Sequence, residues 1–246
     1  MNLQDICCVQ LPQADKAASI CMMDQEIPGT KVICHVLQPG DVICLAPSSE
    51  FVRIMFVCSG DVTITSDATS RHFDQRGVFI GKPHKDLTME AKSPAQVLEL
   101  CRWLTADEYA EVVSSDQLPY DLNYADAVRY TEACKSPKTT SREIVPQRLI
   151  PRFAMGSVET YGKDRIEQHS HPHLEQYFFS LAENNCIALI DDLQYPFGPN
   201  SVLHIPLGSN HGIHLDDEHS CHYLWIDFLL NEEALEYLDT AHTIVE

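Results

Sequence analysis

The chain is 246 residues long with an apolar share of 44%, which fits one large domain or two of ordinary size with an ample core. Its formal charge of −19, from 36 acidic and 17 basic residues, disfavours nucleic acid and anionic membrane surfaces as partners. No run approaches the roughly 18–20 apolar residues of a membrane helix and the N-terminus lacks a secretory signal, so we expect a soluble, cytoplasmic protein with neither kind of partner.

The first part of the chain has the pattern of short β-strands. Four runs are rich in β-branched and apolar residues: residues 30–46, 51–67, 76–91 and 95–104. Pro39-Gly40-Asp41 and Ser59-Gly60-Asp61 supply turn signals within this region. Several short strands at this spacing, with little helix, predict a sandwich or a barrel.

At residues 105–117 the spacing of apolar residues changes from the alternation of a strand to the spacing of a helix. Thr105 is a plausible N-cap and Glu108 completes a capping box, so a short helix is expected. Residues 117–148 are polar, interrupted by prolines, and predict a helical connector that ends in a loop. The expected organisation is an N-terminal barrel over residues 1–116, the connector, and a C-terminal barrel over residues 149–246.

The second part of the chain returns to strands in the same order. The strand-like runs are residues 152–162, 175–191, 201–215 and 221–230, followed by a short C-terminal helix within residues 231–246. The run that begins at Arg53 parallels the one that begins at Gln176. The offset between the two halves is roughly 125 residues, the size of one small domain, which indicates a duplicated β-domain.

The octapeptide HSHPHLEQ, residues 169–176, concentrates potential metal ligands. Residues two apart in an extended chain face the same side, so His169 and His171 point together, and Glu175 can rejoin them after a bend. A further candidate, His211, follows a Pro206-x-Gly208 turn. Imidazoles with one carboxylate suit one divalent transition metal (Fe, Mn, Ni, Co or Zn), and the absence of thiolates argues against a structural zinc site.

These two segments resemble the two motifs of the cupin family, G-x5-H-x-H-x3-4-E-x6-G and G-x5-P-x-G-x2-H-x3-N. The resemblance implies a jelly-roll β-barrel with a metal in its mouth. The implied ligands are His169, His171, Glu175 and His211. The variable gap leaves Gln176 as an alternative to Glu175, which is preferred on strand parity and because a carboxylate binds a cation better than an amide.

The first half lacks this ligand set, because alignment puts Ala46, Ser48 and Val52 where His169, His171 and Glu175 lie. The whole chain therefore resembles a bicupin, a protein of two tandem cupin barrels, with an intact metal motif only in the C-terminal barrel and a degenerate N-terminal one. Two-barrel proteins of this type pair their edge strands, so a homodimer is expected.

Two functions are compatible with this resemblance. The first is a metal-dependent enzyme acting on a small polar metabolite of carboxylate, keto or sugar-acid type, by isomerase, hydrolase, lyase or dioxygenase chemistry. Tyr161 and Lys163 are candidate catalytic residues, as a general acid/base and as a clamp for a substrate carboxylate. The second is a non-catalytic module that binds or senses a small ligand. An open metal site favours the enzyme, because clustered ligands concentrate at functional sites.

Overall fold

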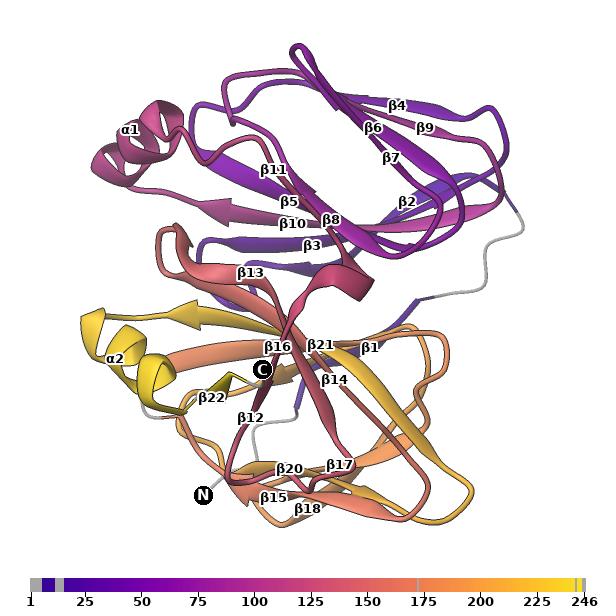
Figure 1. Ribbon diagram of the computed structural model, residues 1–246, viewed down its shortest axis with the longest axis vertical. Helices are drawn as coiled ribbons and strands as arrows, with labels where there is room; N and C mark the ends of the chain where they lie inside the picture. Colours follow the sequence, from indigo (N-terminus) through magenta and orange to yellow (C-terminus); the bar gives the residue numbers. More distant parts are fainter. Residues whose placement is uncertain (1–5, 12–15, 172, 242, 245–246) are drawn as a thin grey trace. The chain divides into compact units, whose positions relative to one another are not determined.

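The computed structural model divides the chain into two compact units. It describes residues 6–11, 16–171, 173–241 and 243–244. Unit 1 contains the described residues up to Gln10 and those from Val128 onwards, whereas unit 2 contains the described residues of Leu11–Ala127. Each unit consists mainly of antiparallel strands, which Figure 1 shows in sequence colours.

Unit 2 is built from two antiparallel β-sheets with a hydrophobic core. The larger sheet contains, in spatial order, β11 (Tyr120–Asn123), β8 (Gly77–Ile80), β5 (Phe51–Ser59), β10 (Ala95–Trp103), β3 (Thr30–Leu37) and β2 (Ala18–Asp24). The smaller sheet contains β4 (Val42–Leu45), β9 (Leu87–Ala91), β6 (Val62–Ser66) and β7 (Thr69–Phe73). Met55, Phe79 and Met89 are fully buried in the core cluster, to which both sheets contribute.

Unit 1 repeats this plan. Its larger sheet contains, in spatial order, β1 (Cys8–Gln10), β19 (Ser201–Ile205), β16 (Leu174–Ser180), β21 (Ser220–Leu229), β14 (Phe153–Tyr161), β13 (Thr140–Ile150), β12 (Val128–Thr131) and β22 (Thr243–Ile244). Its smaller sheet contains β15 (Asp164–His169), β20 (His211–Leu215), β17 (Cys186–Ile190) and β18 (Leu193–Phe197). Side chains such as Ile166, Phe178 and Trp225 form its core.

Helices are few and short among the described residues. Helix α1 (Ala106–Ser114) begins with the capping box that the sequence predicts, in which the Glu108 amide donates to Thr105 Oγ1 at 3.3 Å and the Thr105 amide donates to Glu108 Oε2 at 2.7 Å. Helix α2 (Glu232–Ala241) lies near the C-terminal end, where a helix was expected. No helix in the described part of the chain has the length and apolar character needed to cross a membrane. The predicted all-β class with two barrels is confirmed.

The segment between the two halves is mostly extended. Its helical content is the three-residue 3-10 helix η1 (Tyr124–Asp126), and strands β11, β12 and β13 occupy much of the rest. The two compact units meet in sequence at Ala127 and Val128, inside the segment 117–148. Strand β1 belongs to unit 1, because it pairs with β19, although the expected N-terminal barrel began at residue 1.

Candidate metal centre

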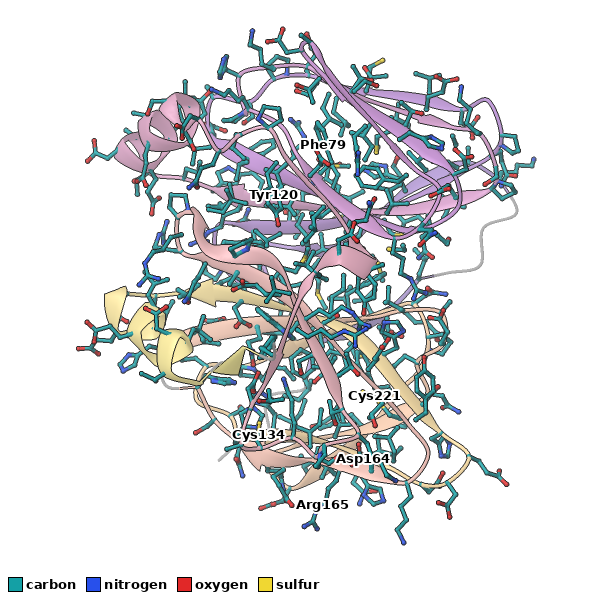
Figure 2. The ribbon with its side chains drawn as sticks, in the orientation of Figure 1. Phe79, Tyr120, Cys134, Asp164, Arg165 and Cys221 are labelled. Carbon is teal, nitrogen blue, oxygen red and sulfur yellow. The ribbon has the colours of Figure 1, made fainter. Side chains whose placement is uncertain are left out.

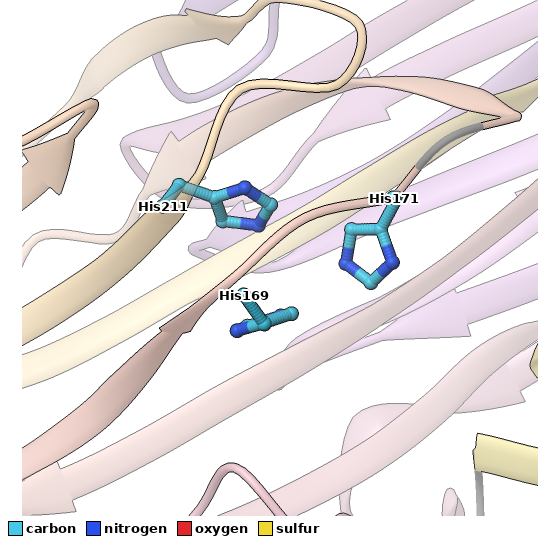
Figure 3. A group of neighbouring side chains, drawn as sticks. All are labelled: His169, His171 and His211. Carbon is cyan, nitrogen blue, oxygen red and sulfur yellow. The ribbon is translucent and has the colours of Figure 1, made fainter.

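Three histidine side chains from two separated segments converge in unit 1. His169 ends β15, His211 begins β20, and the two residues are paired across the smaller sheet. His171 follows in the connection to β16. The ligand nitrogens of these residues lie within 4.8 Å of one another, and Figure 3 shows the three rings turned towards a common space. The structure thus brings together the three histidines that the sequence selected.

A tight turn places His211. The Ser209 amide donates to the Pro206 carbonyl at 3.0 Å, and Gly208 has a φ of +75°. A glycine at this position adopts the left-handed conformation without the steric cost that a side chain would bring. The Pro206-x-Gly208 signal therefore has the turn geometry expected of it.

Backbone carbonyls fix the orientation of two of the rings. His169 Nδ1 lies 2.9 Å from the Glu167 carbonyl oxygen, and His211 Nδ1 lies 3.1 Å from that of Ser209. A carbonyl only accepts, so each Nδ1 carries the proton and each Nε2 keeps its lone pair. This tautomer is the one in which Nε2 can coordinate a metal.

The two buried histidines are neutral near pH 7. Burial lowers the pKa of His171 to about 3, assisted by the charges of His211 and His169. Burial likewise lowers the pKa of His211 to about 4, with a further contribution from His169. Neutral imidazole is the form that binds a metal, so the environment of these rings suits a cation.

Gln176 supplies a fourth donor beside the histidines. Its side chain is 5% exposed and lines the same cavity. Its Nε2 donates to Asp227 Oδ1 at 2.7 Å, which leaves the amide oxygen Oε1 buried and without a hydrogen-bond partner among the described residues. A buried oxygen without a partner is costly unless a ligand satisfies it. The donor set of three imidazoles and one amide oxygen fits a divalent transition metal.

Glu175, the carboxylate preferred on the sequence evidence, does not join the histidines. In β16 the side chains of Leu174, Gln176 and Phe178 face the core of unit 1, and Glu175 faces the other way. Its Oε2 lies 3.3 Å from His204 Nε2. The alternative residue, Gln176, is the one that the structure places in the cavity.

The cavity has an empty volume of about 430 Å3. Beside the histidines and Gln176, its walls include Phe178, Tyr223 and Trp225, which limit the access of water. The backbone approaches Trp225 closely at Gly156 of β14, where a Cβ would lie 2.2 Å from the indole. Only glycine at this position leaves room for the indole, so Gly156 helps to shape the cavity wall.

Glu132 and Lys135 form a charged pair in the cavity wall. Lys135 Nζ donates to Glu132 Oε1 at 2.7 Å and to Ser141 Oγ at 3.1 Å, and the two paired side chains are only 7% and 13% exposed. Glu132 also lies with Cys134 and His169 in a second group whose potential ligand atoms are within 4.8 Å. Lys135 is the one cationic side chain that lines the cavity among the described residues.

Strand β15 holds this segment in place. Lys135 forms an isolated bridge with Ile166, and the Glu167 amide donates to the Cys134 carbonyl at 2.9 Å. Asp164, labelled with Cys134 in Figure 2, accepts a hydrogen bond from Ser136 at 2.9 Å. Sequence reasoning missed Glu132 and Lys135, because they lie in a polar stretch that carries no motif.

The two catalytic candidates from the sequence lie elsewhere. Tyr161 is 61% exposed at the end of β14, and Lys163 is also exposed. Neither is among the described residues that line the cavity. The structure therefore does not bring Tyr161 or Lys163 to the three histidines.

Comparison with known proteins shows similarity in fold only. No family model matches the sequence, and no curated protein matches it. Among solved structures, a putative glyoxylate-induced protein from Pseudomonas aeruginosa superposes with a TM-score of 0.71 at 11% identity, covering 94% of this chain and 90% of that one. Oxalate decarboxylase from Lactobacillus farciminis gives 0.66 at 12% identity, covering 91% and 84%.

A cupin 2 conserved barrel domain protein from Leptotrichia buccalis superposes with a TM-score of 0.58 at 12% identity, covering 89% of this chain and 91% of that one. At such low identity these similarities establish the architecture and not the activity. The structural neighbours are cupin-type proteins, and the protein has an all-β fold of the same type.

Proposed function

We propose that the protein is a metal-dependent enzyme of bicupin type that acts on a small metabolite carrying a carboxylate. The convergence of His169, His171 and His211 on one cavity is the observation that carries this proposal. Both groups of potential metal ligands among the described residues belong to unit 1. The C-terminal barrel is therefore the proposed metal site, and the N-terminal barrel is proposed to hold no metal.

The three histidines and Gln176 would hold the metal. A divalent metal bound there would supply a Lewis acid for a carbonyl or carboxylate oxygen. Asp227 orients Gln176, because a carboxylate accepts only from the NH2 group and so turns Oε1 towards the cavity.

Glu132 and Lys135 are the proposed substrate-handling residues in place of Tyr161 and Lys163. The buried ammonium of Lys135 can bind a substrate carboxylate, and a carboxylate oxygen of Glu132 can accept or return a proton. Their ion pair holds each group in one position before the substrate arrives. Phe178, Tyr223 and Trp225 then exclude water from the bound substrate.

The test of this function compares the purified protein before and after removal of metal by a chelator. Metal content is measured first, and both forms are screened for turnover of a panel of 2-oxo acids, dicarboxylates, uronates and ureido acids. We expect turnover that disappears with the metal and returns when the metal is restored. Bound metal together with ligand binding, but without turnover of any compound in the panel, would instead favour a non-catalytic binding module.

The Asp227→Asn variant tests the role of Gln176. An asparagine in this place can donate as well as accept, so it no longer fixes the Gln176 amide with Oε1 towards the cavity. We expect the affinity for Co(II), measured by titration with the metal alone, to fall roughly 10- to 100-fold, as for other outer-shell partners. The substitution is close to isosteric, so the thermal unfolding curve serves to check that the variant folds.

Glu175→Gln is the matched control for this measurement. It removes one carboxylate from the neighbouring position of β16, where the side chain contacts His204 and not the cavity. Its affinity for Co(II) should equal that of the unmodified protein. A loss of affinity in Glu175→Gln with none in Asp227→Asn would show that Glu175 is the ligand and Gln176 is not.

A further inference from the structure

Unit 2 carries an arginine at the position that Gln176 holds in unit 1. Strand β5 lies between β8 and β10, as β16 lies between β19 and β21. Arg53 of β5 pairs with Cys101 of β10, and Gln176 pairs with Asp227. Where unit 1 offers an oxygen for a cation, unit 2 therefore offers a permanent cation of its own.

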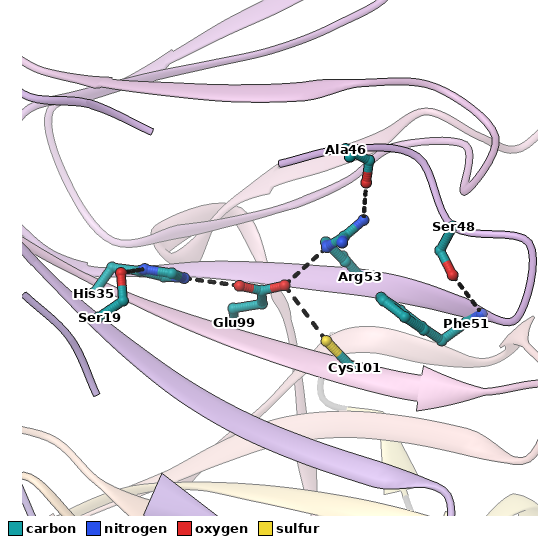
Figure 4. A network of polar contacts seen from close by, with 8 residues as sticks. All are labelled: Ser19, His35, Ala46, Ser48, Phe51, Arg53, Glu99 and Cys101. Atoms are coloured by element: carbon teal, nitrogen blue, oxygen red, sulfur yellow. Dashed lines mark hydrogen bonds and ion pairs between the residues drawn. The ribbon is translucent and has the colours of Figure 1, made fainter. Parts of the chain in front are cut away.

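Three contacts hold the Arg53 side chain in place. Its Nε donates to Glu99 Oε1 at 2.8 Å and its Nη1 to the Ala46 carbonyl at 2.8 Å, while the guanidinium lies 4.7 Å from the centre of the Phe51 ring. Figure 4 shows this network from close by. The second oxygen of Glu99 lies 2.8 Å from His35 Nε2, so the Glu99 carboxylate contacts both Arg53 and His35.

Two hollows in unit 2 share a pair of lysines near Arg53. One has an empty volume of about 220 Å3 and is lined by Arg53, Lys82 and Lys85 together with apolar and backbone groups. The other, of about 340 Å3, is lined by Lys82 and Lys85 with polar residues that include Thr69.

The charge of these hollows is opposite to that of the whole protein. Of only 17 lysines and arginines in the chain, three line the two hollows. Asp67, whose Oδ2 lies 3.2 Å from Lys85 Nζ, is the one acidic side chain that lines them among the described residues. Lys82 Nζ donates to a neutral group, the Val113 carbonyl, at 3.3 Å. Arg53 and Lys85 are ion-paired with Glu99 and Asp67, so the positive charge that remains for an anion is that of Lys82.

We infer that unit 2 contains a second ligand site, which binds a small oxyanionic metabolite, a carboxylate or a phosphate. Arg53, held by Glu99 and the Ala46 carbonyl, provides a preoriented guanidinium in the wall of the site. Lys82 and Lys85 neutralise further oxygens at its rim. The site uses no metal and does not depend on the function proposed for unit 1.

The test measures binding of succinate and of inorganic phosphate to the full chain after removal of metal by a chelator, by calorimetry at constant ionic strength. Removing metal first excludes anions that would bind through a metal at the histidine site. We expect saturable binding, and a loss of affinity of roughly tenfold or more in the double variant Lys82→Met/Lys85→Met. Tighter succinate binding would identify an organic acid as the ligand, and tighter phosphate binding a phosphorylated one.

The double variant Lys31→Met/Lys92→Met is the matched control. It removes the same charge from unit 2 at two lysines that pair with Asp24 and Glu90 and do not line the hollows. Its affinity for both anions should remain close to that of the unmodified protein. If neither anion binds, or if both double variants lose affinity equally, the inference is overturned.

Discussion

Replacement of His211 by alanine is expected to lower the affinity of the protein for Co(II) by at least about 100-fold. Structural zinc sites with four protein ligands bind with about 10–16 kcal/mol, so each ligand accounts for roughly 2.5–4 kcal/mol. His211 is 3% exposed and its ring centre lies 4.7 Å from that of His169, so the substitution removes one of three imidazoles that face the same space. The measurement is a titration with Co(II) followed by its visible spectrum, which also reports the change of ligand field.

His214→Ala is the control for that titration. His214 belongs to the same strand, β20, but its side chain is exposed. The variant removes one imidazole without touching the cavity and should bind Co(II) like the unmodified protein. Equal binding by His211→Ala, shown to be folded by its unfolding curve, would remove the basis of the proposed metal site.

Substitution of Glu99 by glutamine is expected to destabilise unit 2 by about 3 kcal/mol at neutral pH. Glu99 is 2% exposed and accepts from both His35 and Arg53, so the variant leaves the Arg53 charge without its counter-ion in a largely buried place. Glutamine has nearly the volume of glutamate, so the change is one of charge and not of packing. Chemical denaturation in a Trp225→Phe background measures the effect, because Trp103 is then the single tryptophan and belongs to unit 2.

The same substitution should change the response to acid. Burial alone would raise the pKa of Glu99, but the hydrogen bond from His35 and the charges of His35 and Arg53 outweigh it, so the pKa lies below the ordinary value of 4.5. A carboxyl group with a lowered pKa contributes its stability fully above the ordinary value and loses it as the pH falls through the lowered one. The unmodified protein should therefore lose this contribution below about pH 4.5, and Glu99→Gln should lack it.

Glu90→Gln is the comparison for both measurements. Glu90 pairs with Lys92 at the surface of unit 2, and these side chains are 44% and 50% exposed. Pairs of this kind contribute between zero and about 1 kcal/mol. An equal loss of stability in the two variants would show that the buried network around Glu99 is no more important than a surface ion pair.

The architecture of the protein was accessible from its sequence because the signals are local. Alternation of apolar and polar residues predicts the strands, and the capping box of Thr105 and Glu108 predicts the start of α1. The segment around β13 was harder to predict. This strand contains Pro146, and its pairing with β14 shifts register between Glu143 and Val145 and again before Ile150, so a regular period is absent.

The choice between Glu175 and Gln176 shows that the alternation of side chains along a strand cannot be extrapolated from one strand to the next. The preference for Glu175 assumed that the strand parity of His169 and His171 continues beyond the bend to the glutamate. In the structure β15 ends at His169 and β16 begins at Leu174, so the two segments are separate strands. The alternation starts afresh in β16, which turns Gln176 inwards. A carboxylate is the stronger ligand, but Glu175 cannot coordinate a metal in the cavity because its side chain lies on the other side of the sheet.

The position of Glu132 and Lys135 in the cavity wall could not be predicted from the sequence for a different reason. These residues reach the cavity through long-range contacts, the bridge from Lys135 to Ile166 and the bond from Glu167 to Cys134. No spacing along the chain encodes such contacts. The hollows beside Arg53 are likewise visible only once β5 and the loop of Lys82 are brought together.

Strand β1 has a consequence for the order in which the protein assembles. Cys8 pairs with Leu203, a separation of 203 − 8 = 195 residues, and all of unit 2 lies between them in the chain. During synthesis β1 leaves the ribosome long before its partner strand exists, whereas unit 2 has every one of its strands available much earlier. Closing so long a loop is slow, so the edge of unit 1 at β19 should be the last part of the molecule to become protected from hydrogen exchange during refolding.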